Sequence, residues 1–425
     1  MRLIDATALD FAGIVRPGDL VSWPQANAEP LTLTRTLMAQ RHAIGRFRAF
    51  VGISHFDTVA VEHADAVDFS AYCGAGRNRA LARAGLLDPW CWHYSTIARR
   101  FASGETPLDV LLIQVAPGKN GTYSLGVSYE YLADAIARAR VVVAEINDRC
   151  PFTLGEPALR EEDIDVAVRV SRPLDEPAPV DGDATERAVA QGIAGLIEDG
   201  ATLQVGVGGL PGLVLEALSG RRDLGVHSGQ IGDGIAALEE AGVVTNARKS
   251  IDRGMTVAGT MIGGARVHRY AHRNPAVRFR STAYTHDVEV LARIDRLAAV
   301  NAAIEVDLTG QVNAEVAGGT YVGAVGGLVD FLRGAHRSQG GLPIVGLTSR
   351  HGERGRIVAS LAGPASVSRA DAGIVVTEHG VADLRGASMA ERVRRMIAIA
   401  HPDDRENLAR RAHELFRTSA SRNPS

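Results

Sequence analysis

The apolar positions of this chain fall into short runs that alternate with helical patterns. Runs of apolar residues predict strands at residues 202–207 and 224–227, and helical spacing predicts helices at residues 212–218 and 235–241. Further along the chain the pattern predicts buried strands at residues 342–347, 356–361 and 372–377 and an amphipathic basic helix at residues 389–400. Alternating strands and helices are typical of α/β proteins, so we expect open, mostly parallel sheets covered by helices.

A proline-rich segment divides the chain. Residues 173–183 carry three prolines and show neither helical nor strand periodicity, which is typical of a linker. The chain has 425 residues, too many for one core of ordinary size, so two domains are expected. We predict an N-terminal α/β domain over residues 1–172 and a C-terminal domain over residues 184–425.

The two halves resemble each other weakly. Residues 18–30 and residues 200–211 each run from a glycine beside an apolar strand to a proline. Later, residues 141–145 resemble residues 374–378 in context. These similarities favour a pseudo-duplicated protein with its ligand site between the halves, because clefts between domains are common ligand sites.

Composition and charge exclude several classes of protein. The formal net charge of -3 gives no overall basic field that would attract nucleic acid. No apolar run approaches the roughly 20 residues that span a bilayer, and the N-terminus lacks a signal-peptide layout. Cys73, Cys91 and Cys150 lack the spacing of metal ligands and indicate reduced thiols. We therefore expect a cytoplasmic protein with no metal site and neither nucleic acid nor membrane as a partner.

A glycine-rich loop lies between a predicted strand and a predicted helix. Residues 204–211 read QVGVGGLP, and Pro211 suits a first helical turn. Glycines there would let backbone N–H groups face a phosphate, or the carbonyl oxygen of a thioester, beside the positive end of a helix dipole. The spacing matches neither the dinucleotide fingerprint nor a P-loop. Taken alone, the loop is equally consistent with a tight structural turn.

Ordered blocks of sequence carry a stronger signal. They read NAAIEVDLTGQVN at residues 301–313, VGGLVDFLRGA at 325–335, TEHGVA at 377–382, AHP at 400–402 and AEIN at 144–147. Together they resemble the acetyl-CoA hydrolase/transferase family, which includes the acetate and 4-hydroxybutyrate CoA-transferases. The resemblance covers nearly the whole chain and is strongest from about Gly200 onward.

The resemblance implies a fold, a ligand and contact residues. The fold would be two related α/β domains, as in family I CoA-transferases. The substrates would be a short-chain acyl-CoA and a small carboxylic acid, with no cofactor beyond CoA, and the protein would form a homodimer or a larger homo-oligomer. The implied CoA contacts are Gly206, Val207, Gly208, Gly209, Leu210, Ile304, Gly326 and Gly327. Arg333 would either pair with a CoA phosphate or lie in solvent on a helix face.

One family residue is missing. Residues 226–234 read VHSGQIGDG and resemble the family stretch H-[ST]-E-M-x-x-D-G, whose glutamate is the nucleophile. That glutamate attacks the thioester, forms an enzyme-bound anhydride and then carries CoA as a glutamyl thioester. Here the position is Gly229, which has no side chain. On this basis, Gly229→Glu is expected to raise transferase activity.

The missing carboxylate leaves three hypotheses open. In the first, which family membership favours, the protein remains a CoA-transferase and another carboxylate replaces the glutamate, with Glu305 as the candidate and Glu378 as an alternative. In the second it hydrolyses acyl-CoA, with His227 or Glu305 as general base. In the third it binds CoA esters without turning them over. A plain nucleotide-binding module disagrees with the absent dinucleotide fingerprint.

A histidine- and arginine-rich region follows the predicted site. His268, His272 and His286 share a region of the sequence with several arginines at residues 266–280. No carboxylate or cysteine at metal-ligand spacing accompanies them. The region would be either a basic surface that faces CoA phosphates or another subunit, or a solvated charge cluster.

Overall fold

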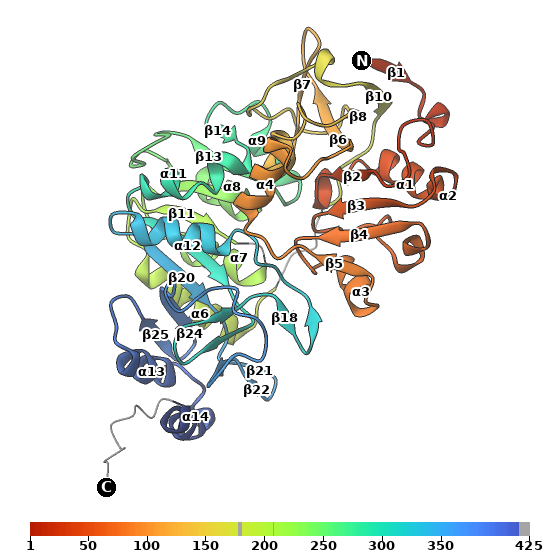
Figure 1. Ribbon diagram of the computed structural model, residues 1–425. Helices are drawn as coiled ribbons and strands as arrows, with labels where there is room; N and C mark the ends of the chain where they lie inside the picture. The colour runs from red at the N-terminus through yellow and green to blue at the C-terminus, as the bar shows by residue number, and fades with distance from the viewer. Residues whose placement is uncertain (177–180, 207, 416–425) are drawn as a thin grey trace.

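Two open sheets, one from each half of the chain, form the framework of the molecule (Figure 1). The computed structural model describes residues 1–176, 181–206 and 208–415. Strands of the larger sheet come from residues 2–170, and strands of the second large sheet come from residues 202–383. No helix within these residues is long and apolar enough to cross a membrane.

The first sheet has ten strands, eight of them in one parallel path. In spatial order that path is β1 (Arg2–Ile4), β10 (Val166–Val170), β8 (Val141–Asn147), β6 (Val110–Pro117), β2 (Leu20–Trp23), β3 (Phe47–Val51), β4 (Val67–Ala71) and β5 (Leu87–Pro89). Two short strands, β7 (Thr122–Ser124) and β9 (Leu159–Arg160), extend from β6 in antiparallel pairing. The central strands are buried on both faces and therefore read as continuous apolar runs.

The second sheet has eight strands and is parallel except at one edge. Its order is β14 (Val277–Phe279), β13 (Thr256–Met261), β12 (Gly225–Ile231), β11 (Thr202–Val205), β15 (Leu297–Ala302), β20 (Leu342–Gly346), β24 (Ile374–Thr377) and β25 (Gly380–Asp383). Only β25 runs antiparallel to its neighbour.

Helices cover both sheets. In the first half they are α1 (Leu31–Ala39), α2 (Arg41–Ile44), α3 (Asn78–Arg83), α4 (Tyr94–Ser103) and α5 (Glu130–Ala133). In the second half they are α6 (Ala184–Leu196), α7 (Gly209–Ala217), α8 (Asp233–Glu240), α9 (Ala265–Ala271), α10 (Thr282–Thr285), α11 (Val288–Ala292), α12 (Leu328–Arg337), α13 (Met389–Ala398) and α14 (Pro402–Leu415). Short 3-10 turns lie at η1 (Ala6–Ala8), η2 (Ala26–Ala28), η3 (Val61–Asp65) and η4 (Glu161–Asp163).

The two sheets share one topology. In the first, the chain runs from β2 outward through β3, β4 and β5, then returns to the other side of β2 with β6, β8 and β10. In the second it runs from β11 through β12, β13 and β14, then returns beside β11 with β15, β20 and β24. This confirms the prediction of two related α/β units. In each sheet the order of the strands therefore reverses beside the first central strand. Open α/β sheets bind ligands at such points of reversal, outside the carboxyl ends of the strands.

The matching topology corrects one of the two predicted similarities. Residues 18–30 and 200–211 do contain the equivalent strands β2 and β11. Residues 141–145, however, belong to β8, whose counterpart is β20, whereas residues 374–377 form β24. Two buried apolar strands next to each other in a sheet have similar sequences, which explains the misassignment.

One predicted strand is mostly not a strand. Within residues 356–361 only β23 (Ile357–Val358) pairs, and it does so outside the large sheets, with β16 (Glu305–Asp307). β17 (Val312–Asn313) completes that three-stranded sheet. The remaining strands form two-stranded hairpins: β18 (Val316–Ala317) with β19 (Thr320–Tyr321), and β21 (Arg350–His351) with β22 (Arg354–Gly355).

The proposed linker at residues 173–183 lies between the strands of the two sheets. Part of it, residues 177–180, lies outside the described residues. Asp183 then caps α6, where its side chain accepts a 2.8 Å bond from the Glu186 backbone N–H. Residues 1–172 and 184–425 remain the proposed domains. One buried apolar cluster contains residues of both. The rings of Tyr129 and Phe279, for example, stack across the two with their centroids 5.6 Å apart.

Candidate active site

A cavity of about 210 Å³ lies where the two sheets turn their carboxyl ends toward each other. In the first half, Gln25, Ile53 and Tyr72 follow the ends of β2, β3 and β4. In the second half, the cavity is lined from β11, β12, β13 and β15. The described lining residues are Gln25, Ile53, Tyr72, Cys73, Tyr94, Gln204, Val205, Gly206, Gly229, Gln230, Thr260, Ile262, His286, Asn301, Ala324, Gly327, Leu328 and Phe331.

Gly229 lies in the cavity wall, and the imidazole of His286 fills the space beside it. A Cβ atom at position 229 would lie 2.8 Å from His286 Cε1 and 2.9 Å from Nε2. A Cβ atom at Gly327 would lie 2.6 Å from Nε2 and from Cδ2 of the same ring. Contacts under 3.0 Å do not occur for real Cβ atoms, so both glycines are needed to accommodate the ring.

The surroundings of His286 keep it neutral. Its ring packs between Tyr94 and Phe331, with centroid distances of 4.9 Å and 4.5 Å. Burial lowers the pKa of His286 to about 3, because water no longer solvates the imidazolium form. Its Nδ1 lies 2.9 Å from the hydroxyl of Thr285. The ring is therefore an uncharged imidazole at neutral pH.

Amide side chains also line the cavity wall. Asn301 Nδ2 donates to Gln204 Oε1 at 3.0 Å, and Gln230 Nε2 donates to the Gly206 carbonyl at 2.9 Å. Each NH₂ group has two hydrogens, and these bonds use one of them. The wall can therefore offer further N–H donors to an oxygen atom in the cavity.

A buried carboxylate lies one layer behind the cavity wall. Gln25 Nε2 donates to both oxygens of Glu130 at 2.9 Å, and the Tyr94 hydroxyl donates to one of them at 2.9 Å. Glu130 has a φ of 27°, a strained conformation for a residue with a side chain. Burial raises the pKa of Glu130. Gln25 and Tyr94 stand between this carboxylate and the cavity.

None of the described lining residues is an aspartate or glutamate. Cys73 is the thiol in the wall, but burial raises its pKa to about 11. A thiol with this pKa is protonated at neutral pH and is a poor nucleophile. The described wall thus offers no ionised side chain to attack a thioester.

The structure places Glu305 elsewhere. Its carboxylate accepts bonds from Arg354 at 3.0 Å, Asn313 at 3.1 Å and the Ala362 backbone N–H at 2.8 Å. It lies in β16, and it is not among the described residues that line the cavity. These contacts satisfy both carboxylate oxygens and give Glu305 a structural role in the small sheet.

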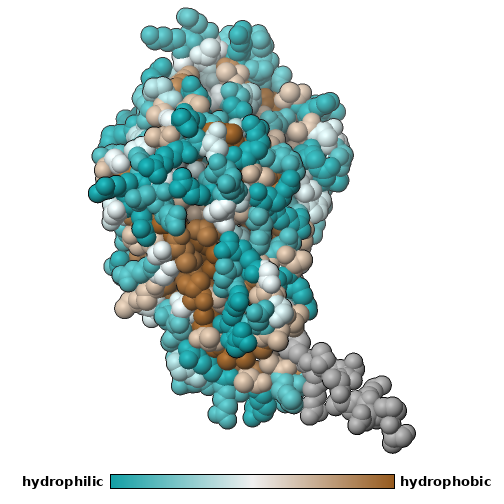
Figure 2. All heavy atoms as spheres, turned by 90° about the vertical axis from the view of Figure 1, so that its left-hand side faces the viewer, coloured by the Kyte–Doolittle hydropathy of each residue, from teal (hydrophilic) through white to brown (hydrophobic). Residues whose placement is uncertain are grey.

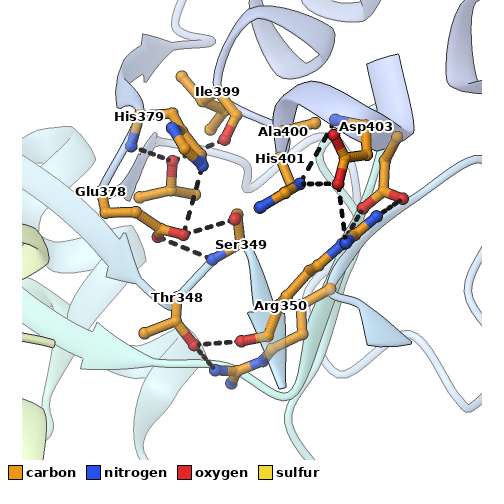
Figure 3. Close-up of polar contacts among 12 residues, drawn as sticks. Thr348, Ser349, Arg350, Glu378, His379, Ile399, Ala400, His401 and Asp403 are labelled. Atoms are coloured by element: carbon orange, nitrogen blue, oxygen red, sulfur yellow. Dashed lines mark hydrogen bonds and ion pairs between the residues drawn. The ribbon is translucent and has the colours of Figure 1, made fainter. Parts of the chain in front are cut away.

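Glu378 is held in a separate polar cluster at the ends of β20 and β24 (Figure 3). The Ser349 hydroxyl donates to one of its oxygens at 2.5 Å, and the Ser349 backbone N–H donates to the other at 2.8 Å. His379 Nε2 lies 3.5 Å from the same carboxylate. Because the glutamate, not the histidine, contacts the serine, this cluster is not arranged as a Ser-His-acid triad.

The predicted CoA contacts are only partly gathered at the cavity. Gly206 and Gly327 line it, and Gly326 is buried directly beside Gly327. Gly208 is the N-cap of α7, which starts with Gly209 and Leu210, so these three lie at the positive end of that helix. Ile304 is half-buried beside Glu305 and is not in the described lining, and Val207 lies outside the described residues.

Three other sequence expectations change. His227 is fully buried and is not in the described lining, so it has no access to the cavity as a base. Arg333 pairs with Asp371 at 3.0 Å. His286 was expected on a basic surface or in a solvated charge cluster, but it is only 5% exposed and lines the cavity. No sequence periodicity distinguishes it, because glycines far away in the chain create its space.

Comparison with known proteins identifies the family. A sequence profile of the acetyl-CoA hydrolase/transferase C-terminal domain matches residues 263–412. The chain is 39% identical to the 4-hydroxybutyrate coenzyme A transferase of Clostridium kluyveri over 346 residues, covering 80% of this chain and 81% of that protein. The chain belongs to the acetyl-CoA hydrolase/transferase family. This confirms the resemblance read from the sequence blocks.

The relatives include proteins named for CoA transfer and proteins named for acetyl-CoA hydrolysis. The crystal structure of RipA from Yersinia pestis superposes with a TM-score of 0.91 at 30% identity and covers 97% of each chain. The acetyl-CoA hydrolase of Saccharomyces cerevisiae is 31% identical over 205 residues, covering 47% of this chain and 38% of that protein. An enzyme of one of these two kinds, CoA-transferase or acyl-CoA hydrolase, is therefore supported.

Proposed function

We propose that this family member hydrolyses a short-chain acyl-CoA thioester. The observation that carries the proposal is the neutral imidazole of His286 in the space beside Gly229, together with a described cavity wall that has no carboxylate. A covalent transfer of CoA needs an enzyme carboxylate, because the acyl group must leave as a free acid while CoA stays on the enzyme. Hydrolysis, in which water attacks the thioester directly, needs no such carboxylate.

The remaining wall suits hydrolysis. The amides of Gln204, Gln230 and Asn301 have N–H groups that can bind the negative charge on the thioester oxygen during attack. The N-terminus of α7 beside Gly206 adds a favourable dipole. The apolar part of the wall, with Ile53, suits a short acyl chain. The cavity of about 210 Å³ holds an acyl group but not a whole CoA, which would extend outward along the glycine-rich loop.

CoA transfer to a small carboxylic acid is the second candidate. The observation that favours it is the relationship to the Clostridium kluyveri protein, whose name describes a CoA-transferase, over four-fifths of both chains. Transfer would require a carboxylate outside the described wall, and Glu130 behind Gln25 and Tyr94 is the one closest to it by contact. Rearrangement of both side chains would be needed to expose it.

The deciding experiment follows thioester consumption with and without a carboxylate acceptor. Acetyl-, propionyl- and butyryl-CoA are incubated with the enzyme, with or without acetate or propionate that differs from the acyl group, and free CoA thiol and new acyl-CoA are measured. Hydrolysis predicts thiol release that acceptor does not change. Acceptor-dependent appearance of a new acyl-CoA without thiol release would establish transfer instead. Binding of acyl-CoA with no turnover in either condition would contradict both and indicate a CoA-ester-binding protein.

We also propose that the protein forms a homodimer or a larger homo-oligomer. Figure 2 shows an elongated apolar strip on a face that is otherwise largely hydrophilic. Contiguous apolar patches of this kind commonly mark protein interfaces. Light scattering at several concentrations measures the mass directly; the mass of a single chain, 45.0 kDa, at all of them would contradict the proposal.

A further inference from the structure

We propose that His286 is the general base that activates water for thioester hydrolysis and the acid that protonates the leaving sulfur. The proposal rests on the proposed hydrolysis and adds the identity of the catalytic group. It is carried by three features of the site: the place of the ring, the hydrogen bond that sets its tautomer, and the side chains that hold it.

The two glycines place Nε2 of His286 at the cavity wall. A Cβ at either glycine would meet two ring atoms, and Nε2 is the one common to both, at 2.9 Å from position 229 and 2.6 Å from position 327. Both glycines and His286 line the cavity. Because neither position carries a side chain, the ring has room there, and its Nε2 lies close to both glycines of the cavity wall.

The Thr285 hydroxyl sets the tautomer. This hydroxyl lies 3.3 Å from the Ser281 carbonyl, to which it donates, and 2.9 Å from His286 Nδ1. A hydroxyl has one hydrogen, so both bonds form together only when Nδ1 carries a hydrogen and donates it to Thr285. Nε2 then has the lone pair, so the ring nitrogen beside Gly229 and Gly327 is the one able to accept a proton.

Packing holds the ring in this orientation. Tyr94 lies against His286 from the first half of the chain, and Phe331 of α12 lies against it from the second. The Tyr94 hydroxyl is itself fixed by its bond to Glu130. A ring restrained in this manner keeps Nε2 directed at one point in the cavity, as general-base catalysis requires.

The reaction uses only water, the thioester and groups of the cavity wall. His286 Nε2 takes a proton from water as the water oxygen bonds to the thioester carbon, and the carbonyl π electrons move to oxygen, where amide N–H groups bind the charge. When the oxyanion collapses, the C–S bond breaks and its electron pair goes to sulfur, which takes the proton from Nε2. The products are the free acid and CoA thiol, and His286 returns to its neutral form.

The first test replaces His286 by phenylalanine, which keeps the ring shape but has no base. We expect kcat for thiol release to fall by about 10²-fold, the low end for general-base catalysis, because the buried ring is a weak base. We also expect the acyl-CoA dissociation constant, measured by calorimetry, to change less than threefold. His272→Phe is the matched control, since His272 is exposed and is not among the described lining residues; it should keep wild-type kcat.

The second test separates catalysis from space filling. In His286→Ala, added imidazole should restore hydrolysis, and imidazoles of similar size but different basicity should restore it in the order of their basicity. A ring that only fills space would restore activity independently of basicity. His286→Phe with wild-type kcat, or rescue that ignores basicity, would overturn the proposal. Wild-type enzyme that releases no thiol would instead contradict the proposed hydrolysis itself.

Discussion

A side chain at position 229 and the imidazole of His286 compete for the same space. A Cβ at 229 would lie 2.8 Å from the ring, so Gly229→Glu alone forces the ring or the strand to move. We expect this variant to lose about 1–3 kcal/mol of stability, as overpacked cores do, and to gain no transferase activity. This replaces the expectation from sequence that the single change would raise activity.

Removing the ring should let the carboxylate enter. In Gly229→Glu combined with His286→Ala, the side chain at 229 gains the volume of the imidazole beside Phe331. We expect acceptor-dependent formation of new acyl-CoA from this double variant, with His286→Ala alone as the control. Mass spectrometry of the acyl-CoA products makes the measurement. Exchange by the single glutamate variant at wild-type stability would show that the ring and the carboxylate do not compete.

At the scale of elements, the turn from β11 into α7 depends on one glycine. Gly208 has a φ of +125°, which residues with a side chain rarely adopt, although a Cβ there would meet no atom within 4 Å. We expect Gly208→Ala to cost about 1–3 kcal/mol through backbone strain and to raise KM for acyl-CoA by displacing the loop.

Gly212, four residues after Gly208, provides a control in which alanine should have the opposite effect on stability. It lies exposed inside α7 and also has free space at its Cβ, so Gly212→Ala should stabilise the protein by up to about 1 kcal/mol through helix propensity. Thermal unfolding midpoints and KM values for both variants test the pair. Two alanine variants that shift stability in the same direction would contradict the assignment of strain to Gly208.

The elements around this loop could be predicted from the sequence, whereas the role of His286 could not. β11, α7, β12 and α8 follow from apolar periodicity and glycine placement within one stretch of chain, and the structure confirms all four within a few residues. His286 could not be found in this manner. Its role depends on glycines 57 residues before it and 41 residues after it, which only the packed fold brings together. Glu305 was chosen because the family resemblance places its sequence block beside CoA, whereas the fold directs its carboxylate to Arg354, Asn313 and Ala362.

For the whole molecule, buried ionisable groups act on stability in opposite directions as pH falls. The pKa of His286 is lowered from 6.5 to about 3, so below pH 6.5 the unfolded chain binds a proton that the folded chain does not, and stability is lost. Burial raises the pKa of Glu29 and of Glu239 to about 7 from 4.5, so between these values the folded state holds the extra proton and stability is gained. The stability of the wild type therefore does not isolate any one group.

The difference in unfolding free energy between the wild type and His286→Phe does isolate the contribution of His286. His286→Phe keeps the ring but removes the titration, and all other buried groups cancel in the comparison. From pH 7.5 to pH 5 we expect the unfolding free energy of the variant to rise relative to wild type by about 2 kcal/mol, since one pKa unit corresponds to about 1.4 kcal/mol. Urea unfolding of both proteins at pH 5, 6 and 7.5 measures it. A constant difference across these pH values would mean that His286 titrates normally in the folded state, and that the ring is not held as a buried neutral imidazole between Gly229 and Gly327.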